Sequence, residues 1–122
     1  MSALAPGITH WQTITVTSDL SPPHLAPIVV LSTPDMIRLM EETCTSAVQP
    51  LIEEDDQTSV GVHVDVSHES AARQGEQVEV SCELLEVDGR RLTFAVEARV
   101  GDRIVGQGTH RRHVIDRSRF RG

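Results

Sequence analysis

A side chain able to transfer protons stands at the end of one alternating stretch, "VGVHVDVSHE" at residues 60–69. Valines occupy every second position from Val60 to Val66, and the same alternation brings His68 next onto that face. Successive residues of a strand point to opposite faces, so His68 is predicted at the rim of an apolar surface. An imidazole between core and water can accept and return a proton. A strand-end histidine with a local hydrogen-bond partner is the other interpretation of this pattern.

A carboxylate suited to the same chemistry comes from the adjacent pair Glu41 and Glu42. Neighbours on a helix are about 100° apart around its axis, so the two glutamates cannot share a face. Glu41 follows Met40 near the apolar stripe of a predicted helix and is expected to approach a pocket, whereas Glu42 is expected in solvent. A carboxylate at such a boundary can act as a general base. A boundary charge paired with an arginine is the competing interpretation of Glu41.

Thr33 stands where the same helix is predicted to begin. The first turn of a helix offers unpaired N–H groups and the positive end of the helix dipole, which suit an oxyanion that forms on a carbonyl. A threonine at this place can also be a plain N-cap, which stabilises a helix by about 1 kcal/mol. Both roles can hold together, so the sequence alone leaves the function of Thr33 open.

The segment of residues 32–51, "STPDMIRLMEETCTSAVQPL", carries the signals of one long helix. Ser32 or Thr33 can cap it, Pro34 fits the first turn, and Pro50 is expected to end its regular part. Apolar residues recur at intervals of three and four and predict a buried stripe. The predicted stripe contains Met36, Met40, Cys44, Ala47 or Val48, and Leu51.

Alternating apolar residues and turn signals predict strands elsewhere. The expected strands cover residues 9–19, 58–69, 78–87, 91–100 and 103–116, and prolines interrupt the chain after the first. Asp88–Gly89 and Gly101–Asp102 are tight-turn signals, and the apolar phase slips at Leu85, which indicates a bulge. Gly106 and Gly108 weaken the last strand or allow another backbone to approach. Sequential hairpins make an antiparallel sheet, and one helix must cover a face of it, so the predicted fold class is α+β.

Composition indicates one acidic domain. The expected domain covers residues 1–122, with a loose start at 1–8 and a loose tail at 116–122. A net charge of −7 disfavours a nucleic-acid partner, although the basic C-terminal stretch could be either a solvated tail or a surface for a phosphorylated cofactor. No apolar run approaches the ~20 residues of a membrane span, and no signal-peptide pattern opens the chain. We therefore expect a cytoplasmic protein with no membrane contact.

The cysteines and histidines give no sign of a metal site. Cys44 and Cys82 fall within apolar patterns, which predicts free, buried thiols rather than a disulfide. His63 and His68 lie on one predicted strand but point to opposite sides, so they cannot share a zinc ion. His110 and His113 lie on opposite faces of the last predicted strand. Together with Arg111 and Arg112 they could meet phosphate groups or simply form a polar strand end.

Four stretches resemble the hotdog-fold acyl-CoA thioesterases, and most of all the fluoroacetyl-CoA thioesterase type. They are "STPDMIRLMEETC", "SVGVHVDVSH", "VEVDGRRLTF" and "GQGTHRRHVI", which together span most of the chain from Leu31 onward. The interval from Thr33 to Glu41 and the interval from Gly61 to His68 match those of the family. The resemblance implies a hotdog fold, in which a curved antiparallel sheet wraps round one long helix.

The resemblance also implies site residues. Thr33, Glu41 and His68 match the catalytic threonine, glutamate and histidine of the family. Gly61 matches a glycine close to the substrate, and Arg112 matches an arginine near the acyl pocket. Hydrolysis of an acyl thioester needs carbonyl polarisation, an activated water and a proton for the thiolate, and these residue types can supply all three. A hotdog module that binds an acyl group or a protein partner without hydrolysis is the alternative function.

Partners follow from the same resemblance. The family is homodimeric, with active sites at or near the dimer interface, and it uses no metal and no cofactor apart from the coenzyme A of its substrate. A sheet with one helix would leave an exposed edge, and two copies joined edge to edge would hide it. Thr33 and Glu41 are about 12 Å apart along one helix at 1.5 Å per residue. Either the segment of Thr33 folds back to bring them together within one chain, or the pair is completed across the dimer.

One segment departs from the fluoroacetyl type. Those enzymes carry a longer segment before the helix, with aromatic residues that help to close the acyl pocket. This chain has "SPPHLAPIVVL" at residues 21–31, with three prolines and no aromatic side chain. The departure predicts hydrolysis without strong selectivity for fluoroacetyl over acetyl groups, because an apolar pocket distinguishes one methylene by only ~1–3 kcal/mol.

Overall fold

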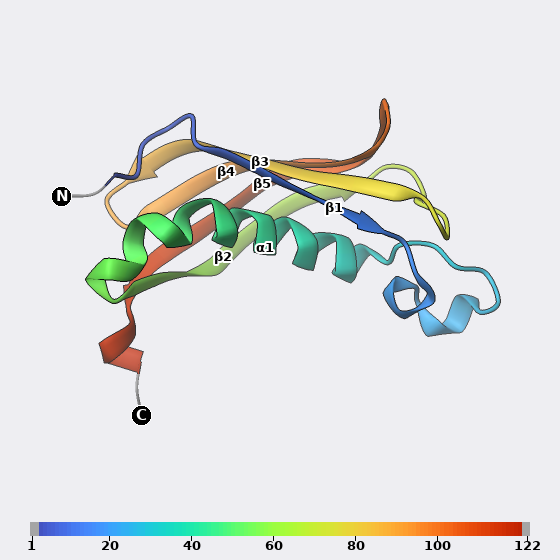
Figure 1. The fold of residues 1–122 in the computed structure, drawn as a ribbon, viewed down its shortest axis with the longest axis horizontal. Coiled ribbons are helices and arrows are strands. Elements are labelled where there is room, and N and C mark those ends of the chain that lie inside the picture. Colours follow the sequence, from blue (N-terminus) through green and yellow to red (C-terminus); the bar gives the residue numbers. More distant parts are fainter. Residues whose placement is uncertain (1–2, 121–122) are drawn as a thin grey trace.

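One long helix lies across the concave face of a five-stranded antiparallel sheet (Figure 1). The computed structural model describes residues 3–120. The regular elements are β1 (Thr9–Thr15), α1 (Thr33–Ile52), β2 (Gln57–His68), β3 (Gln77–Asp88), β4 (Arg91–Val100) and β5 (Arg103–Asp116). Short 3-10 turns cover Ser18–Leu20, Pro23–Leu25, Glu53–Asp55 and Arg117–Phe120. The predicted α+β class and element order are confirmed.

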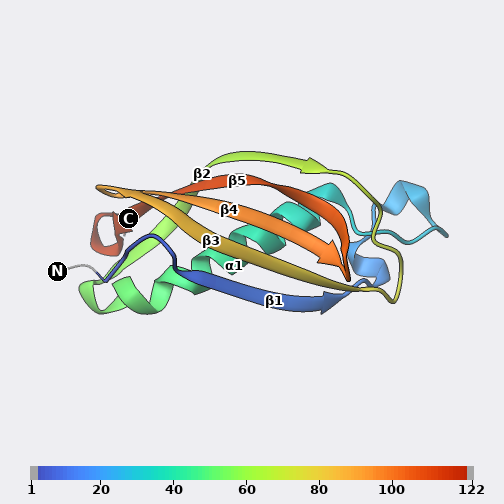
Figure 2. The ribbon, with the colours of Figure 1, turned by 90° about the horizontal axis from the view of Figure 1, so that it is seen from above.

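The sheet order is β1-β3-β4-β5-β2, so β1 and β2 form its two edges (Figure 2). Both predicted hairpins are present: β3 and β4 are joined at Gly89, and β4 and β5 at Gly101, each of which has a positive φ. These left-handed conformations are favourable for glycine, which has no Cβ. The bulge predicted at Leu85 is also confirmed, because the β3–β4 register shifts between Leu84 and Glu86.

The helix buries a stripe that differs at its end from the predicted one. The buried residues are Met36, Leu39, Met40, Thr43, Cys44, Val48 and Ile52. Leu51 was expected inside but is 38% exposed, because the inward position four residues after Val48 is Ile52. The expectation that Pro50 ends the helix is also wrong. The Glu53 N–H still donates to the Gln49 carbonyl, so helical bonding resumes directly beyond the proline.

A bulge in β2 corrects the prediction that its valines share one face. The register with β5 shifts between Gly61 and His63, so Val60 pairs with His113 and Val64 pairs with His110. Directly opposed residues share a face, and positions 110 and 113 lie on opposite faces of β5. Val60 therefore lies on the other face from Val64. His68 keeps the face of Val64 and lies on the helix side, as predicted.

The core is aliphatic, with Phe94 as its largest fully buried side chain. Cys44 and Cys82 are both free and buried, as predicted. Their mutual hydrogen bond and their burial raise the pKa of the Cys44 thiol, so it stays protonated and unreactive. Gly106 permits the close approach expected of it, since a Cβ there would lie 2.8 Å from the Ser67 carbonyl oxygen.

The segment before β1 bonds to β3. The Gly7 N–H donates to the Leu84 carbonyl, and the Leu84 N–H donates to the Ile8 carbonyl. The expected loose segments extend to residues 1–2 and 121–122, which lie outside the described part of the chain. Within residues 3–120, no helix is both long and apolar enough to span a membrane.

Candidate active site

The Thr33 hydroxyl lies against the His68 imidazole where α1 begins and β2 ends. The Thr33 Oγ1 and His68 Nδ1 atoms are 2.7 Å apart, within hydrogen-bond distance. Ser32 is the N-cap, and its Oγ accepts from the Asp35 N–H at 3.1 Å. The interpretation of Thr33 as a plain N-cap is therefore wrong, and its hydroxyl is left to His68. Thr33 is exposed and His68 is half-buried, so solvent or substrate can reach the pair.

Glu41 lies two turns farther along α1 and faces the first half of β2. A Cβ atom on Gly61 would lie 2.7 Å from Glu41 Oε1 and 3.1 Å from His110 Cε1. Glycine at this position therefore makes room for the carboxylate. The Arg112 Nη1 atom is 3.7 Å from the same Oε1, which is an ion pair but too long for a hydrogen bond. Glu41, Gly61 and Arg112 form one cluster on the helix side of the sheet.

Arg112 is a buried cation with a fixed guanidinium plane. The residue is 5% exposed, and burial lowers the pKa of its guanidinium from the usual value. Its Nε–H donates to Ser59 Oγ at 2.7 Å, and its Nη2–H donates to the Ser59 carbonyl at 2.8 Å. Its Nη1 lies 3.1 Å from His110 Nε2. The Nε, Nη1 and Nη2 atoms are thus all held by two residues, Ser59 on β2 and His110 on β5.

His110 is fully buried beside this guanidinium. Its Nδ1 is 2.8 Å from the His63 carbonyl oxygen, which can only accept, so Nδ1 carries a proton. Arginine can only donate, so the Nε2 that faces Arg112 carries none. The ring is consequently neutral. Burial is the main cause that lowers the pKa of His110, and the nearby Arg112 charge acts in the same direction.

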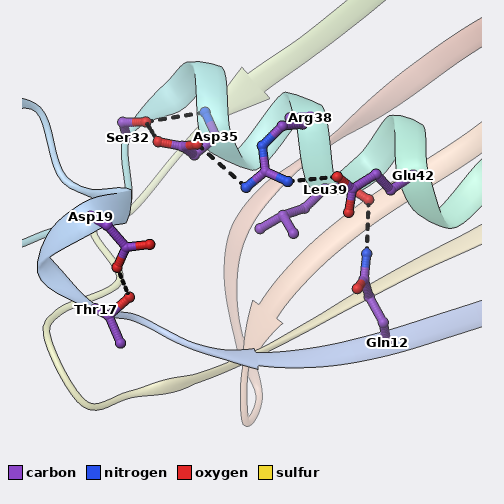
Figure 3. A network of polar contacts seen from close by, with 8 residues as sticks. All are labelled: Gln12, Thr17, Asp19, Ser32, Asp35, Arg38, Leu39 and Glu42. Carbon is purple, nitrogen blue, oxygen red and sulfur yellow. Dashed lines mark hydrogen bonds and ion pairs between the residues drawn. The ribbon is translucent and has the colours of Figure 1, made fainter.

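Glu42 lies on the outer face of the helix, as predicted. Arg38 pairs with Glu42 at 2.6 Å and with Asp35 at 3.5 Å (Figure 3). The Glu42 side chain is 51% exposed, so this contact is a surface ion pair of small energetic value. The competing interpretation of Glu41 as a carboxylate paired with an arginine holds in part, since Arg112 is nearby, but that arginine is buried rather than solvated.

The predicted site residues fall into two clusters within one chain. Thr33 contacts His68. Glu41 lies beside Gly61 and forms an ion pair with Arg112. Both helical residues belong to one regular helix, so eight residues separate the clusters by about 12 Å along its axis. An open hollow of about 510 Å³ lies beside the second cluster and is lined by Arg38, Glu41, Glu42, Thr45, Ser46 and Arg112. Neither Thr33 nor His68 lines that hollow.

Sequence reasoning missed Ser59 and gave His110 the wrong surroundings. His110 was expected to meet phosphate groups or end a strand, yet it is 1% exposed and bonded within the sheet. The contact of His110 with Arg112 could have been predicted, because residues two apart on a strand share a face and Arg112 was already a candidate site residue. Ser59 had no comparable signal, since its contact depends on the β2–β5 register. Within residues 3–120, no group of three or more His, Cys, Asp or Glu residues could hold a metal ion.

The buried neutral His110 predicts a pH dependence of stability. In the unfolded chain its pKa returns to the ordinary 6.5, so below that pH the unfolded state binds more protons than the folded state. Stability is therefore unaffected by this group above pH 6.5 and falls as the pH drops toward the lower folded pKa. We expect the free energy of unfolding to fall more steeply on acidification in the wild type than in His110→Gln. Urea denaturation at pH 7.5, 6.5 and 5.5 (chosen to bracket the ordinary value) and at one protein concentration measures this, and parallel pH dependences would contradict it.

Comparisons with known proteins agree on the fold and on one family. A sequence profile described as fluoroacetyl-CoA-specific thioesterase matches residues 10–118. The fluoroacetyl-CoA thioesterase of Streptantibioticus cattleyicolor is 40% identical over 91 residues, which cover 75% of this chain and 65% of that protein. The match thus spans slightly less than two thirds of the relative's length.

Solved structures extend the likeness over nearly the whole chain. A structure of the fluoroacetyl-CoA thioesterase FlK superposes with a TM-score of 0.87 at 32% identity and covers 97% of this chain and 93% of that one. A thioesterase superfamily member from Thermus thermophilus superposes with a TM-score of 0.88 at 22% identity and covers 98% and 90%. The latter likeness concerns the fold alone. Together with the single helix and the curved antiparallel sheet, these superpositions confirm the predicted hotdog fold.

Proposed function

Since the chain belongs to the fluoroacetyl-CoA-specific thioesterase family, we propose that it hydrolyses an acyl-CoA thioester to a free acid and coenzyme A. The observation that carries this proposal is the 2.7 Å contact of Thr33 with His68 at the start of α1. Among the described residues, this contact couples a hydroxyl and an imidazole directly at a helix N-terminus. The substrate is the small-molecule acyl thioester, and the protein uses no metal and no further cofactor.

The chemistry divides among the predicted residues by their surroundings. Glu41 takes a proton from a water molecule as the water oxygen attacks the thioester carbonyl carbon. The helix N-terminus at Thr33 favours the negative charge that develops on the carbonyl oxygen. As the carbon–sulfur bond breaks, His68 donates a proton to the thiolate, and the Thr33 hydroxyl holds the imidazole in position. Gly61 keeps the strand backbone close to Glu41, and Arg112 attracts polar groups of the acyl chain.

The protein acts as a homodimer in this proposal. β2 is an edge strand, and its valines at positions 60, 62 and 64 are 41%, 56% and 40% exposed. An apolar edge with unpaired backbone groups is a site for pairing with another strand. Antiparallel pairing of β2 with the β2 of a second copy would cover these valines and extend the sheet across the dimer.

Such pairing would also complete the site. In a two-fold antiparallel pair centred on Asp65, the bulge at Gly61–His63 of one chain lies beside His68 of the partner subunit. Both Gly61 and His68 lie on the helix side of the sheet. The Thr33–His68 cluster of one chain would thus meet the Glu41 cluster of the other, which no single chain achieves over about 12 Å.

A thiol-release assay tests the proposed activity. The purified protein is incubated with acetyl-CoA, longer acyl-CoAs and an acyl-carrier protein, and free thiol is measured. Release from at least one acyl-CoA above the buffer rate is expected. Binding without release from any of these substrates would contradict hydrolysis and favour the non-hydrolytic acyl-binding module. The cytoplasmic location expected from the sequence stays a prediction.

Selectivity for the acyl group is expected to be weak. Residues 21–31 contain no aromatic side chain and are held by bonds such as Leu31 N–H to the Ala72 carbonyl, between β2 and β3, and Val30 N–H to Ser21 Oγ. Ile28 in this segment is 62% exposed. Without a lid that fits a small group, kcat/KM for fluoroacetyl-CoA should exceed that for acetyl-CoA by far less than ~10⁴-fold. Steady-state kinetics with both substrates measure the ratio, and a ratio above ~10⁴ would show that this segment does not set selectivity.

A further inference from the structure

The buried polar cluster behind Glu41 contains two residues without an assigned role. Ser59 is 5% exposed and His110 is 1% exposed, so neither is reached by solvent. Both bond to Arg112, which takes three contacts of 2.7, 2.8 and 3.1 Å from them. Buried polar groups cost free energy unless they are paired. The Ser59 hydroxyl, the Ser59 carbonyl and the His110 Nε2 atom all face the same guanidinium, and the His110 Nδ1 atom bonds to the His63 carbonyl. The cluster is therefore built around the position of Arg112.

The contact of Arg112 with Glu41 is an ion pair without a hydrogen bond. The Nη1 to Oε1 distance is 3.7 Å, whereas a charge-assisted hydrogen bond between these groups would measure about 2.7–2.9 Å. Arg112 does not close this gap because Ser59 and His110 already hold its Nε, Nη2 and Nη1 atoms. The carboxylate keeps an attracting cation beside it while its oxygens stay free of a direct bond.

We propose that Ser59 and His110 are positioning residues that hold the Arg112 guanidinium near Glu41 but out of hydrogen-bond reach. A general base needs an oxygen that can accept a proton from water. A closed, bidentate arginine bond would occupy the lone pairs of Glu41 and lower its activity. The inference rests on the proposed hydrolysis and deepens it, because it explains how Glu41 remains available as the base.

His110 can do this only as the neutral Nδ1–H form. A second proton on Nε2 would face the Arg112 N–H group, and the acceptor that holds Nη1 would be lost. The other charged or titratable groups around the ring are Glu41 from α1, the His63 ring on β2 and Arg112 itself. Protonation of His110 is thus expected to release Arg112 toward Glu41 and to lower kcat on the acid side.

Matched variants separate positioning from packing. His110→Gln keeps an acceptor near the Nε2 position, and His110→Asn keeps only a donor near the Nδ1 position. With acetyl-CoA, His110→Asn should lose about tenfold more kcat than His110→Gln, with similar KM values, because small displacements of catalytic groups cost one to two orders of magnitude. Ser59→Ala should lose kcat similarly, and Ser59→Thr, which keeps the hydroxyl, should restore it. The acid-side loss of kcat due to His110 should disappear in His110→Gln.

A readout that needs no turnover accompanies the kinetics. Nitrogen-15 NMR of histidine-labelled protein should show His110 as the Nδ1–H tautomer in the wild type, and Ser59→Ala should perturb its Nε2 signal. Thermal unfolding confirms that each variant is folded. Equal losses in His110→Asn and His110→Gln, no rescue by Ser59→Thr, or an Nε2–H tautomer would overturn the inference. A wild type that releases no thiol but shows the Nδ1–H tautomer would contradict the proposed hydrolysis while the positioning contacts stand.

Discussion

Glu41→Gln and His68→Ala are each expected to lower kcat for acyl-CoA hydrolysis by at least ~100-fold, the usual contribution of a general base or acid. Glutamine keeps the size of Glu41 but cannot take a proton from water. Alanine at 68 removes both the proton donor and the partner of the Thr33 hydroxyl, which lies 2.7 Å from the imidazole. Steady-state thiol release at saturating substrate measures both effects.

Glu42→Gln is the matched control for this prediction. Glu42 is the neighbour of Glu41 on the same helix and has the same side chain, but it lies in a surface ion pair with Arg38. Its replacement should leave kcat close to that of the wild type and change stability by no more than about 1 kcal/mol. A large loss of kcat in Glu42→Gln, with Glu41→Gln active, would show that the assignment of the two faces is reversed.

The facing of Glu41 and Glu42 could be predicted because a helix has a fixed angular step. The 3.6-residue period depends only on backbone geometry, so one apolar stripe was enough to orient the pair. The predicted stripe included one exposed residue, Leu51, and omitted the buried residues Leu39, Thr43 and Ile52. Local periodicity therefore predicts side-chain direction well within one element.

The β2 strand shows where local periodicity fails. A bulge at Gly61–His63 moves Val60 to the other face from Val64, and nothing in the alternation of valines indicates it. At the bulge the backbone passes close to Glu41, which is 20 residues away in sequence, since a Cβ on Gly61 would lie 2.7 Å from its Oε1. The surroundings of Arg112 are of the same kind, since Ser59 lies 53 residues away from it. Such contacts depend on strand register, which the sequence pattern of one segment does not contain.

Because the site is divided into two clusters, we expect activity to return when two inactive variants are mixed. His68→Ala and Glu41→Gln proteins are mixed, dissociated and reassociated. If each site combines the Thr33–His68 cluster of one chain with the Glu41 cluster of the other, every mixed dimer holds one intact site. Random association gives half mixed dimers, so about a quarter of wild-type activity should return.

The control for this experiment uses two variants of one cluster. Thr33→Ala and His68→Ala affect residues that contact each other at 2.7 Å in the same chain, so no mixed dimer of these two restores a complete site. Light scattering at micromolar concentration should show a species of about twice the 13.4 kDa chain mass for every protein used. Because Glu41 and His68 lie in separate clusters, only the first mixture should recover. Equal recovery in both mixtures, or a species that remains at 13.4 kDa, would rule out a site shared between chains.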